Sequence, residues 1–248
     1  SDLKGKRIIA TFDMKPGEEL MMKVALSTTS VEGAKKNLQA EIPDWNFDGV
    51  KLAAHDEWNS YLSRIDVEGT DDEKTNFYTC FYHALIQPNQ ISDVDGMYRN
   101  AADSIVKAGT GTFYSTFSLW DTYRAAHPFY TLMVPERVDG FVNSLIEQGE
   151  VQGFLPIWAL WGKENFCMIG NHGVSVIAEA YRKGFHGFDA ERAFNMVKKT
   201  QTVSHPLKSD WEVYTKYGYF PTDLTKAESV SSTLESVYDD YAAADMAR

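Results

Sequence analysis

Two short stretches near the middle of the chain bring tryptophan rings and carboxylates together. A sugar ring has an apolar face of C–H groups and a rim of hydroxyls, so flat indoles suit its face and carboxylates suit its hydroxyls. This combination of residue types therefore favours a carbohydrate ligand. The residues concerned are Trp120 and Asp121 in the stretch 114–122, and Trp158, Trp161 and Glu164 in the stretch 155–172.

Each of these residues also has an ordinary structural interpretation. Asp121 lies near an expected helix start, where a capping carboxylate stabilises a helix by about 0.5–2 kcal/mol. Tryptophan rings often only fill a core, and a loop glutamate such as Glu164 is usually solvated. The residue types alone leave the sugar-binding and the structural interpretations open.

Further polar residues are candidates for supporting roles. His172 follows a glycine and an asparagine at an expected helix start; it is either a hydrogen-bonded structural residue or a substrate contact at the mouth of a barrel. Arg124 lies one helical turn after Asp121, which predicts a pair that orients the carboxylate. Asp239 and Asp240 diverge by about 100° on a helix, so only one can face inward. We expect that one to be a hydrogen-bonded structural residue.

Size, charge and composition limit the classes of function. A chain of 248 residues with 44% apolar and 13% aromatic residues can bury the core of one large domain. The net charge of −11 argues against a nucleic-acid or anionic-membrane partner. The sequence has no run of ~18 apolar residues that predicts a transmembrane helix. Its first residues lack the apolar core of a signal peptide, although a leader removed during export would leave the same sequence.

The elements that must position these residues change in type along the chain. Residues 7–12 and 20–26 predict strands, and Lys15-Pro16-Gly17-Glu18 between them supplies a turn. Two strands make no stable sheet alone. We therefore expect them to be the last strands of a β domain.

From about Val31 onward, apolar residues recur with helical spacing. Thr70–Glu73 and Thr225–Glu228 each have the form of a capping box at a helix start. Residues 89–111 are polar and aperiodic, with a short hairpin expected around Asp95-Gly96. Antiparallel helix pairs joined by aromatic-rich loops indicate a mainly α fold, either a helical bundle or an α/α toroid. Further helices are expected from Pro135, from Val174 and from Asp189.

Several blocks of the chain, in the same order, resemble glycoside hydrolase family 92, whose α-mannosidases trim N-glycans and mannan. The blocks are residues 114–128, 135–137, 153–172 and 229–241. The resemblance implies that the chain is an internal piece of a longer polypeptide. It divides the chain into the last strands of an N-terminal β-sandwich (1–30), linker helices with a hairpin (31–111) and the first half of an (α/α)6 catalytic barrel (112–248).

The resemblance also implies an exo-acting, inverting, calcium-dependent mannosidase, with α-1,2 linkages as the expected target. Inversion uses one carboxylic acid to protonate the leaving oxygen and one carboxylate to activate water. In the family both groups, and most calcium ligands, lie in motifs after the equivalent of Arg248. Glu164 is a weaker candidate for the acid, and we assign no metal ligand in this chain.

By the resemblance, the chain supplies part of the wall that binds the terminal mannose, with Asp121 accepting a sugar hydroxyl. The expected partners are a mannose-containing glycan and the remaining half of the same polypeptide, in an exported protein. Two alternatives stay open: a non-catalytic carbohydrate-binding piece, or another α/α-toroid glycosidase or phosphorylase. The sugar-binding residues are expected to share one hollow, and they are Trp120, Asp121, Trp158, Trp161, Glu164 and His172.

Overall fold

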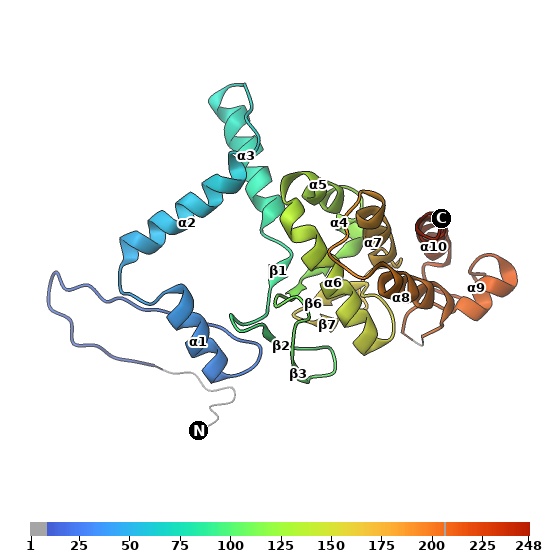
Figure 1. The fold of residues 1–248 in the computed structure, drawn as a ribbon, viewed down its shortest axis with the longest axis horizontal. Helices are drawn as coiled ribbons and strands as arrows, with labels where there is room; N and C mark the ends of the chain where they lie inside the picture. Colours follow the sequence, from blue (N-terminus) through green and yellow to red (C-terminus); the bar gives the residue numbers. More distant parts are fainter. Residues whose placement is uncertain (1–8, 206) are drawn as a thin grey trace.

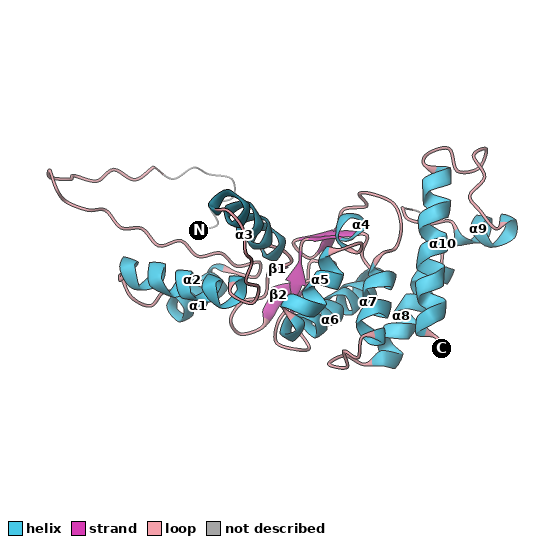
Figure 2. Ribbon diagram, turned by 90° about the horizontal axis from the view of Figure 1, so that it is seen from above, coloured by secondary structure: helices cyan, strands magenta, loops and turns pink. Residues whose placement is uncertain are grey.

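A computed structural model describes residues 9–205 and 207–248, and helices predominate among them (Figure 2). The mainly α fold class is thereby confirmed. The helices are α1 (Val31–Glu41), α2 (Phe47–Leu62), α3 (Asp71–Leu85), α4 (Leu119–Thr122), α5 (Ala126–Met133), α6 (Pro135–Gln152), α7 (Gly173–Arg182), α8 (Ala190–Thr202), α9 (Trp211–Tyr217) and α10 (Ser229–Met246).

Short strands connect the helices and form small antiparallel sheets: β1 with β4, β2 with β3, and β5–β6–β7. They are β1 (Asn89–Gln90), β2 (Met97–Arg99), β3 (Ile105–Lys107), β4 (Tyr114–Ser115), β5 (Phe117–Ser118), β6 (Trp158–Leu160) and β7 (Lys163–Glu164).

The main core lies between α6 and α7, with α5, α8 and α10 packed around them, whereas α2 and α3 extend away from this body (Figure 1). Leu145 and Ile146 on α6 and Ile177 on α7 are completely buried. Pro135 occupies the first position of α6, where its missing N–H costs nothing. Gly153 ends that helix with φ of 96°, a conformation that glycine adopts without strain. These local signals fix both ends of the central helix.

Of the helix caps expected from the sequence, those at Thr70 and Asp189 are confirmed and the one at Thr225 is wrong. Thr70 and Glu73 form the reciprocal capping box before α3, and Asp189 accepts a hydrogen bond from the Arg192 N–H at the start of α8. The box expected from Thr225 to Glu228 does not form. Instead Glu228 precedes α10 with φ of 56° and makes no side-chain cap. The backbone conformation of the turn before α10 therefore prevents the capping box, although residues 225–228 have the sequence of one.

The strand expected over residues 20–26 does not form. Residues 9–26 contain no paired strand, and Leu20, Met22 and Val24 are exposed. A strand needs a neighbouring strand to form hydrogen bonds with its N–H and C=O groups. Among the described residues, no strand pairs with residues 20–26. Residues 7 and 8 of the other expected strand lie outside the described residues, and the expected division into domains stays a prediction.

The hairpin expected around Asp95-Gly96 lies later in the chain. Asp93 to Gly96 makes a separate turn, closed by a 2.8 Å hydrogen bond from the Gly96 N–H to the Asp93 carbonyl. The hairpin itself joins β2 to β3, and the Asn100 side chain shapes its loop by accepting the N–H groups of Ala102 and Ser104. An Asx-type side chain, rather than the Asp-Gly pair, sets this turn.

Leu145→Ala should lower the free energy of unfolding by about 2–5 kcal/mol, because it leaves a cavity in a core that cannot collapse around it. Leu132, 70% exposed on α5, is the matched control, and Leu132→Ala should change stability by less than about 0.5 kcal/mol. Thermal or denaturant unfolding of both variants measures the difference. Equal midpoints for the two variants would contradict the position of the core.

Candidate active site

The two tryptophan-rich stretches meet through strand pairing. Ser118 on β5 lies opposite Trp158 on β6 in the antiparallel register. The Ser118 hydroxyl donates a hydrogen bond to the carboxylate of Asp121, which lies three residues later on α4. The β5–β6 pair therefore places Trp158 beside the short helix that carries Trp120 and Asp121. Asp121 itself is exposed, and its carboxylate can accept further hydrogen bonds.

Trp161 lies at a different place from Trp158. It occupies the β6–β7 turn with φ of 51°, next to Gly162, where an added Cβ would come within 2.8 Å of the Arg99 carbonyl oxygen. The indole is 54% exposed and lines a cavity of about 660 Å³ together with residues from the 24–28 segment and from α1. Asp121 and Trp158 do not line that cavity. A single hollow that contains all the expected sugar-binding residues therefore stays a prediction.

Glu164 on β7 holds the loop around it. Its carboxylate oxygens accept the backbone N–H groups of Ile157, Trp158, Asn165 and Phe166 at 2.7–3.1 Å. A carboxylate with this many backbone donors is well satisfied and has little capacity left for a ligand. The geometry supports a structural role for Glu164, and it does not present the residue as the proton-donating acid.

His172 is buried rather than open to solvent. Only 1% of it is exposed, and it precedes α7 with its Nδ1 at 3.0 Å from Oδ1 of Asp239. Its ring stacks on Tyr123 at 3.9 Å between centroids. These contacts with protein groups favour the structural interpretation of His172. A direct contact with a sugar stays a prediction, and the burial of the side chain does not support it.

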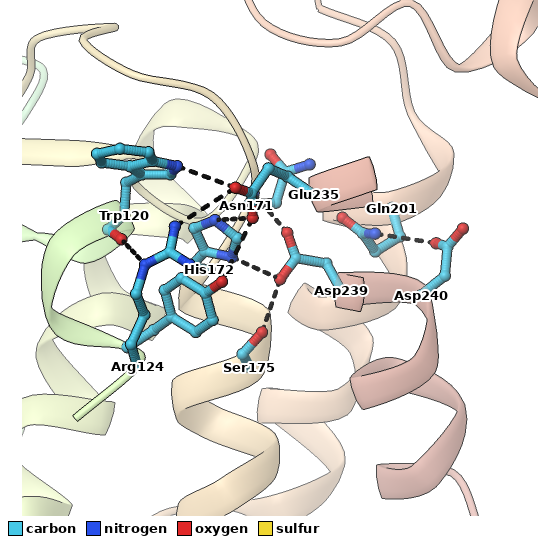
Figure 3. A network of polar contacts seen from close by, with 10 residues as sticks. Trp120, Arg124, Asn171, His172, Ser175, Gln201, Glu235, Asp239 and Asp240 are labelled. Atoms are coloured by element: carbon cyan, nitrogen blue, oxygen red, sulfur yellow. Dashed lines mark hydrogen bonds and ion pairs between the residues drawn. The ribbon is translucent and has the colours of Figure 1, made fainter. Parts of the chain in front are cut away.

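The buried carboxylate of Asp239 on α10 connects α10 to the start of α7 (Figure 3). It accepts the Asn171 N–H at 2.7 Å and the Ser175 hydroxyl at 2.6 Å, in addition to the contact with His172. A buried charge is tolerated only when it is paired and hydrogen-bonded. The expected structural role of Asp239 is thereby confirmed.

Asp240 points to the other side of α10. It accepts hydrogen bonds from Gln201 Nε2 at 2.9 Å and from the Tyr214 hydroxyl at 3.1 Å. Burial raises the pKa of the Asp240 carboxyl, and these hydrogen bonds oppose the rise. The two adjacent aspartates thus serve different contacts, as the helical geometry requires.

Glu235, which the sequence reasoning missed, receives several donors from the 120–124 segment (Figure 3). Its carboxylate accepts the indole N–H of Trp120 at 3.1 Å and lies 3.4 Å from the Arg124 guanidinium. The predicted pairing of Arg124 with Asp121 is therefore wrong. Arg124 instead binds Glu235 and covers the Trp120 ring, 5.0 Å from its centroid.

A signal for Glu235 was present in the sequence. It lies four residues before Asp239, so both carboxylates lie on one face of α10. Together with burial, the Glu235 carboxylate raises the pKa of the Tyr123 hydroxyl, which donates to it at 3.4 Å. Spacing shows which residues share a helix face, but it does not show which segment packs against that face.

The acidic, histidine and cysteine side chains of the described residues do not gather into a metal-binding cluster. Within residues 9–205 and 207–248, no three His, Cys, Asp or Glu side chains lie so that they could share an ion. The carboxylates of Asp239 and Glu164 are instead satisfied by protein donors. Calcium binding by the protein stays a prediction.

Comparison with known proteins identifies the family of this fold. A family model described as the glycosyl hydrolase family 92 catalytic domain matches residues 33–248. A family 92 α-mannosidase from Bacteroides thetaiotaomicron, also solved with mannoimidazole, is 38% identical with a TM-score of 0.85, over 89% of this chain and 29% of that chain. A second protein of that bacterium, described as an inverting mannosidase, is 28% identical with a TM-score of 0.74, over 89% of this chain and 34% of that chain.

A curated relative adds a secreted protein to these matches. An uncharacterised secreted glycosidase from Arthroderma benhamiae is 25% identical over 241 residues, which are 88% of this chain and 26% of that protein. The chain therefore spans about a third or less of the length of each of these relatives. It corresponds to one portion of a much longer polypeptide in each of them.

Glu164→Gln should destabilise the loop 155–167 by about 1–3 kcal/mol, because an amide NH2 group would face backbone N–H groups that the carboxylate now accepts. Hydrogen exchange at the amides of Ile157 and Phe166 measures the loss. Glu150→Gln is the control, since Glu150 takes part in a solvent-accessible ion pair with Arg192, which contributes less than about 1 kcal/mol. Unchanged exchange in Glu164→Gln would show that the loop does not depend on this carboxylate.

Proposed function

Since the chain belongs to glycosyl hydrolase family 92, we propose that it forms part of an α-mannosidase that removes terminal α-linked mannose from glycans. The observation that carries the proposal is the meeting of Trp158 with the Trp120-Asp121 helix through the β5–β6 pair. The match to a 38% identical α-mannosidase supports the same substrate class. The activity belongs to the whole protein, of which this chain supplies sugar-binding residues.

Asp121 is the residue that contacts the terminal sugar in this proposal. It is exposed at the surface of α4 and already accepts the Ser118 hydroxyl, which orients its carboxylate. A carboxylate binds sugar hydroxyls through charge-assisted hydrogen bonds, which are stronger than bonds between neutral groups. The adjacent Trp120 offers an apolar ring to the C–H face of the same sugar.

The reaction is proposed to invert the anomeric configuration. An inverting glycosidase needs an acid and a base about 6.5–9.5 Å apart, with a water between the base and the sugar. Glu164, Asp239 and Glu235 are not assigned to this pair, because each binds protein donors. By resemblance to the family, both catalytic carboxylates come from motifs that this chain does not contain.

Calcium, linkage and location are further parts of the proposal. We propose calcium dependence and a preference for α-1,2 linkages from the family resemblance. Export is proposed because a curated relative is described as secreted. Among the described residues, no helix has both the length and the apolar character needed to cross a bilayer.

Asp121→Asn, in the protein produced with its complete natural sequence, should lower kcat/KM on a terminal α-mannoside about 10- to 100-fold. The reason is the loss of a charge-assisted hydrogen bond of about 1.5–3 kcal/mol. Asp103→Asn is the matched control, because Asp103 lies on the β2–β3 loop, its side chain is 61% exposed, and it forms an ion pair with Lys163. Wild-type kinetics in Asp121→Asn would remove Asp121 from the proposed site.

Hydrolysis of α-1,2-mannobiose by the same full-length protein should release β-mannose first, as proton NMR of the anomeric signals would show. A chelator should abolish the reaction, and added calcium should restore it. First release of α-mannose would refute inversion, and activity that persists in the chelator would refute the calcium requirement. Tight binding of mannobiose without any cleavage would favour the non-catalytic carbohydrate-binding alternative.

A further inference from the structure

Trp120, the aromatic neighbour of Asp121, is fixed at two points. An indole N–H can only donate a hydrogen bond, and that of Trp120 is directed to Oε1 of Glu235 at 3.1 Å. Arg124 covers one face of the ring, with its guanidinium 5.0 Å from the ring centroid, and donates to the Trp120 carbonyl at 3.1 Å. The same guanidinium lies 3.4 Å from the Glu235 carboxylate. Glu235 therefore contacts both the N–H of the indole and the cation that covers its face.

Glu235 is in turn held from the core. It lies on α10, one helical turn before Asp239, and its side chain is only 17% exposed. Nε2 of His172 lies 3.1 Å from Oε2 of Glu235, and the ring of His172 is fixed by Asp239 on its Nδ1 side and by stacking on Tyr123. Asp239 is completely buried. A continuous series of polar contacts thus runs from the core to the indole of Trp120 (Figure 3).

We propose that Glu235 is a positioning residue for sugar binding: it fixes the Trp120 ring and Arg124 beside Asp121, without touching the sugar. The inference rests on the proposed function, because it assigns Glu235 to the same terminal-mannose site. A side chain orients a ligand-binding group well when its own rotamer is locked by supporting hydrogen bonds. Glu235 accepts hydrogen bonds from Trp120, Tyr123 and Arg124, and Nε2 of His172 lies 3.1 Å from its carboxylate. The His172 ring is itself fixed by Asp239.

The role of Glu235 is distinct from that of a general stabilising carboxylate. Its donors Trp120, Tyr123 and Arg124 all belong to the short segment that carries Asp121, which is separated from α10 by more than a hundred residues of chain. α4 has only four residues and makes no side-chain cap. A helix this short has little stability of its own. The contacts with Glu235 therefore determine the orientation of the Trp120 and Asp121 side chains.

The test is a double-mutant cycle in the full-length protein, with the dissociation constant of mannoimidazole as the probe. Trp120→Phe keeps a ring but removes the N–H, and Glu235→Leu keeps the bulk but removes the acceptor. Each should weaken binding about 10-fold. Both changes break the same contact. The dissociation constant of the double variant should therefore equal that of the single variant that binds more weakly. Losses that multiply to about 100-fold would overturn the proposal.

Two further variants separate positioning from simple destabilisation. Glu235→Gln retains an acceptor oxygen and should bind within about 3-fold of the wild type. Glu150→Leu breaks the ion pair between α6 and α8 and should leave the affinity unchanged. If Glu235→Leu does not fold, Trp120→Phe decides, because wild-type affinity in that variant would overturn the proposal. Weakened binding in Asp121→Asn with wild-type binding in Glu235→Leu would refute the positioning role alone, whereas wild-type binding in both would refute the proposed function.

Discussion

The structure depends on the accommodation of one buried carboxylate. Asp239 is completely buried, where an unpaired charge would be prohibitively costly, and it is tolerated because a backbone N–H, a hydroxyl and an imidazole surround it. Those donors come from the turn before α7 and from α7 itself, so the position of α10 is determined relative to the central helices (Figure 3). Hydrogen bonds to a buried carboxylate depend on distance and angle, so they restrict the relative positions of these helices more than apolar contacts do.

The candidate site is built outward from this point. Glu235 follows the same face of α10 and meets the segment that carries Trp120 and Asp121, while the β5–β6 pair brings Trp158 to that segment from the other direction. The positioning of the site thus combines long-range side-chain contacts with strand register. Glu164 contributes differently, since its carboxylate holds the loop that contains β6 and β7.

Local patterns predicted the structure well wherever neighbouring residues decide the outcome. The capping box at Thr70, the cap at Asp189 and Pro135 at the first position of α6 all depend on contacts within one turn. Residues 20–26 show the limit of such reasoning, because an alternating pattern cannot form a strand without a partner backbone. The hairpin loop at Asn100 and the turn at Glu228 show that several turn patterns can compete.

By itself, the sequence determined the mainly helical fold, the ends of several helices and, through its resemblance, the membership of family 92. It also indicated which stretches carry the candidate site, since Trp120, Asp121 and Trp158 lie in two short blocks. Only the tertiary structure decided that His172 is buried, that Glu164 holds a loop and that Arg124 pairs with Glu235 rather than Asp121. The physical reason is that a charged side chain selects its partner by distance in space, and residues far apart in sequence can be closer than those one helical turn away.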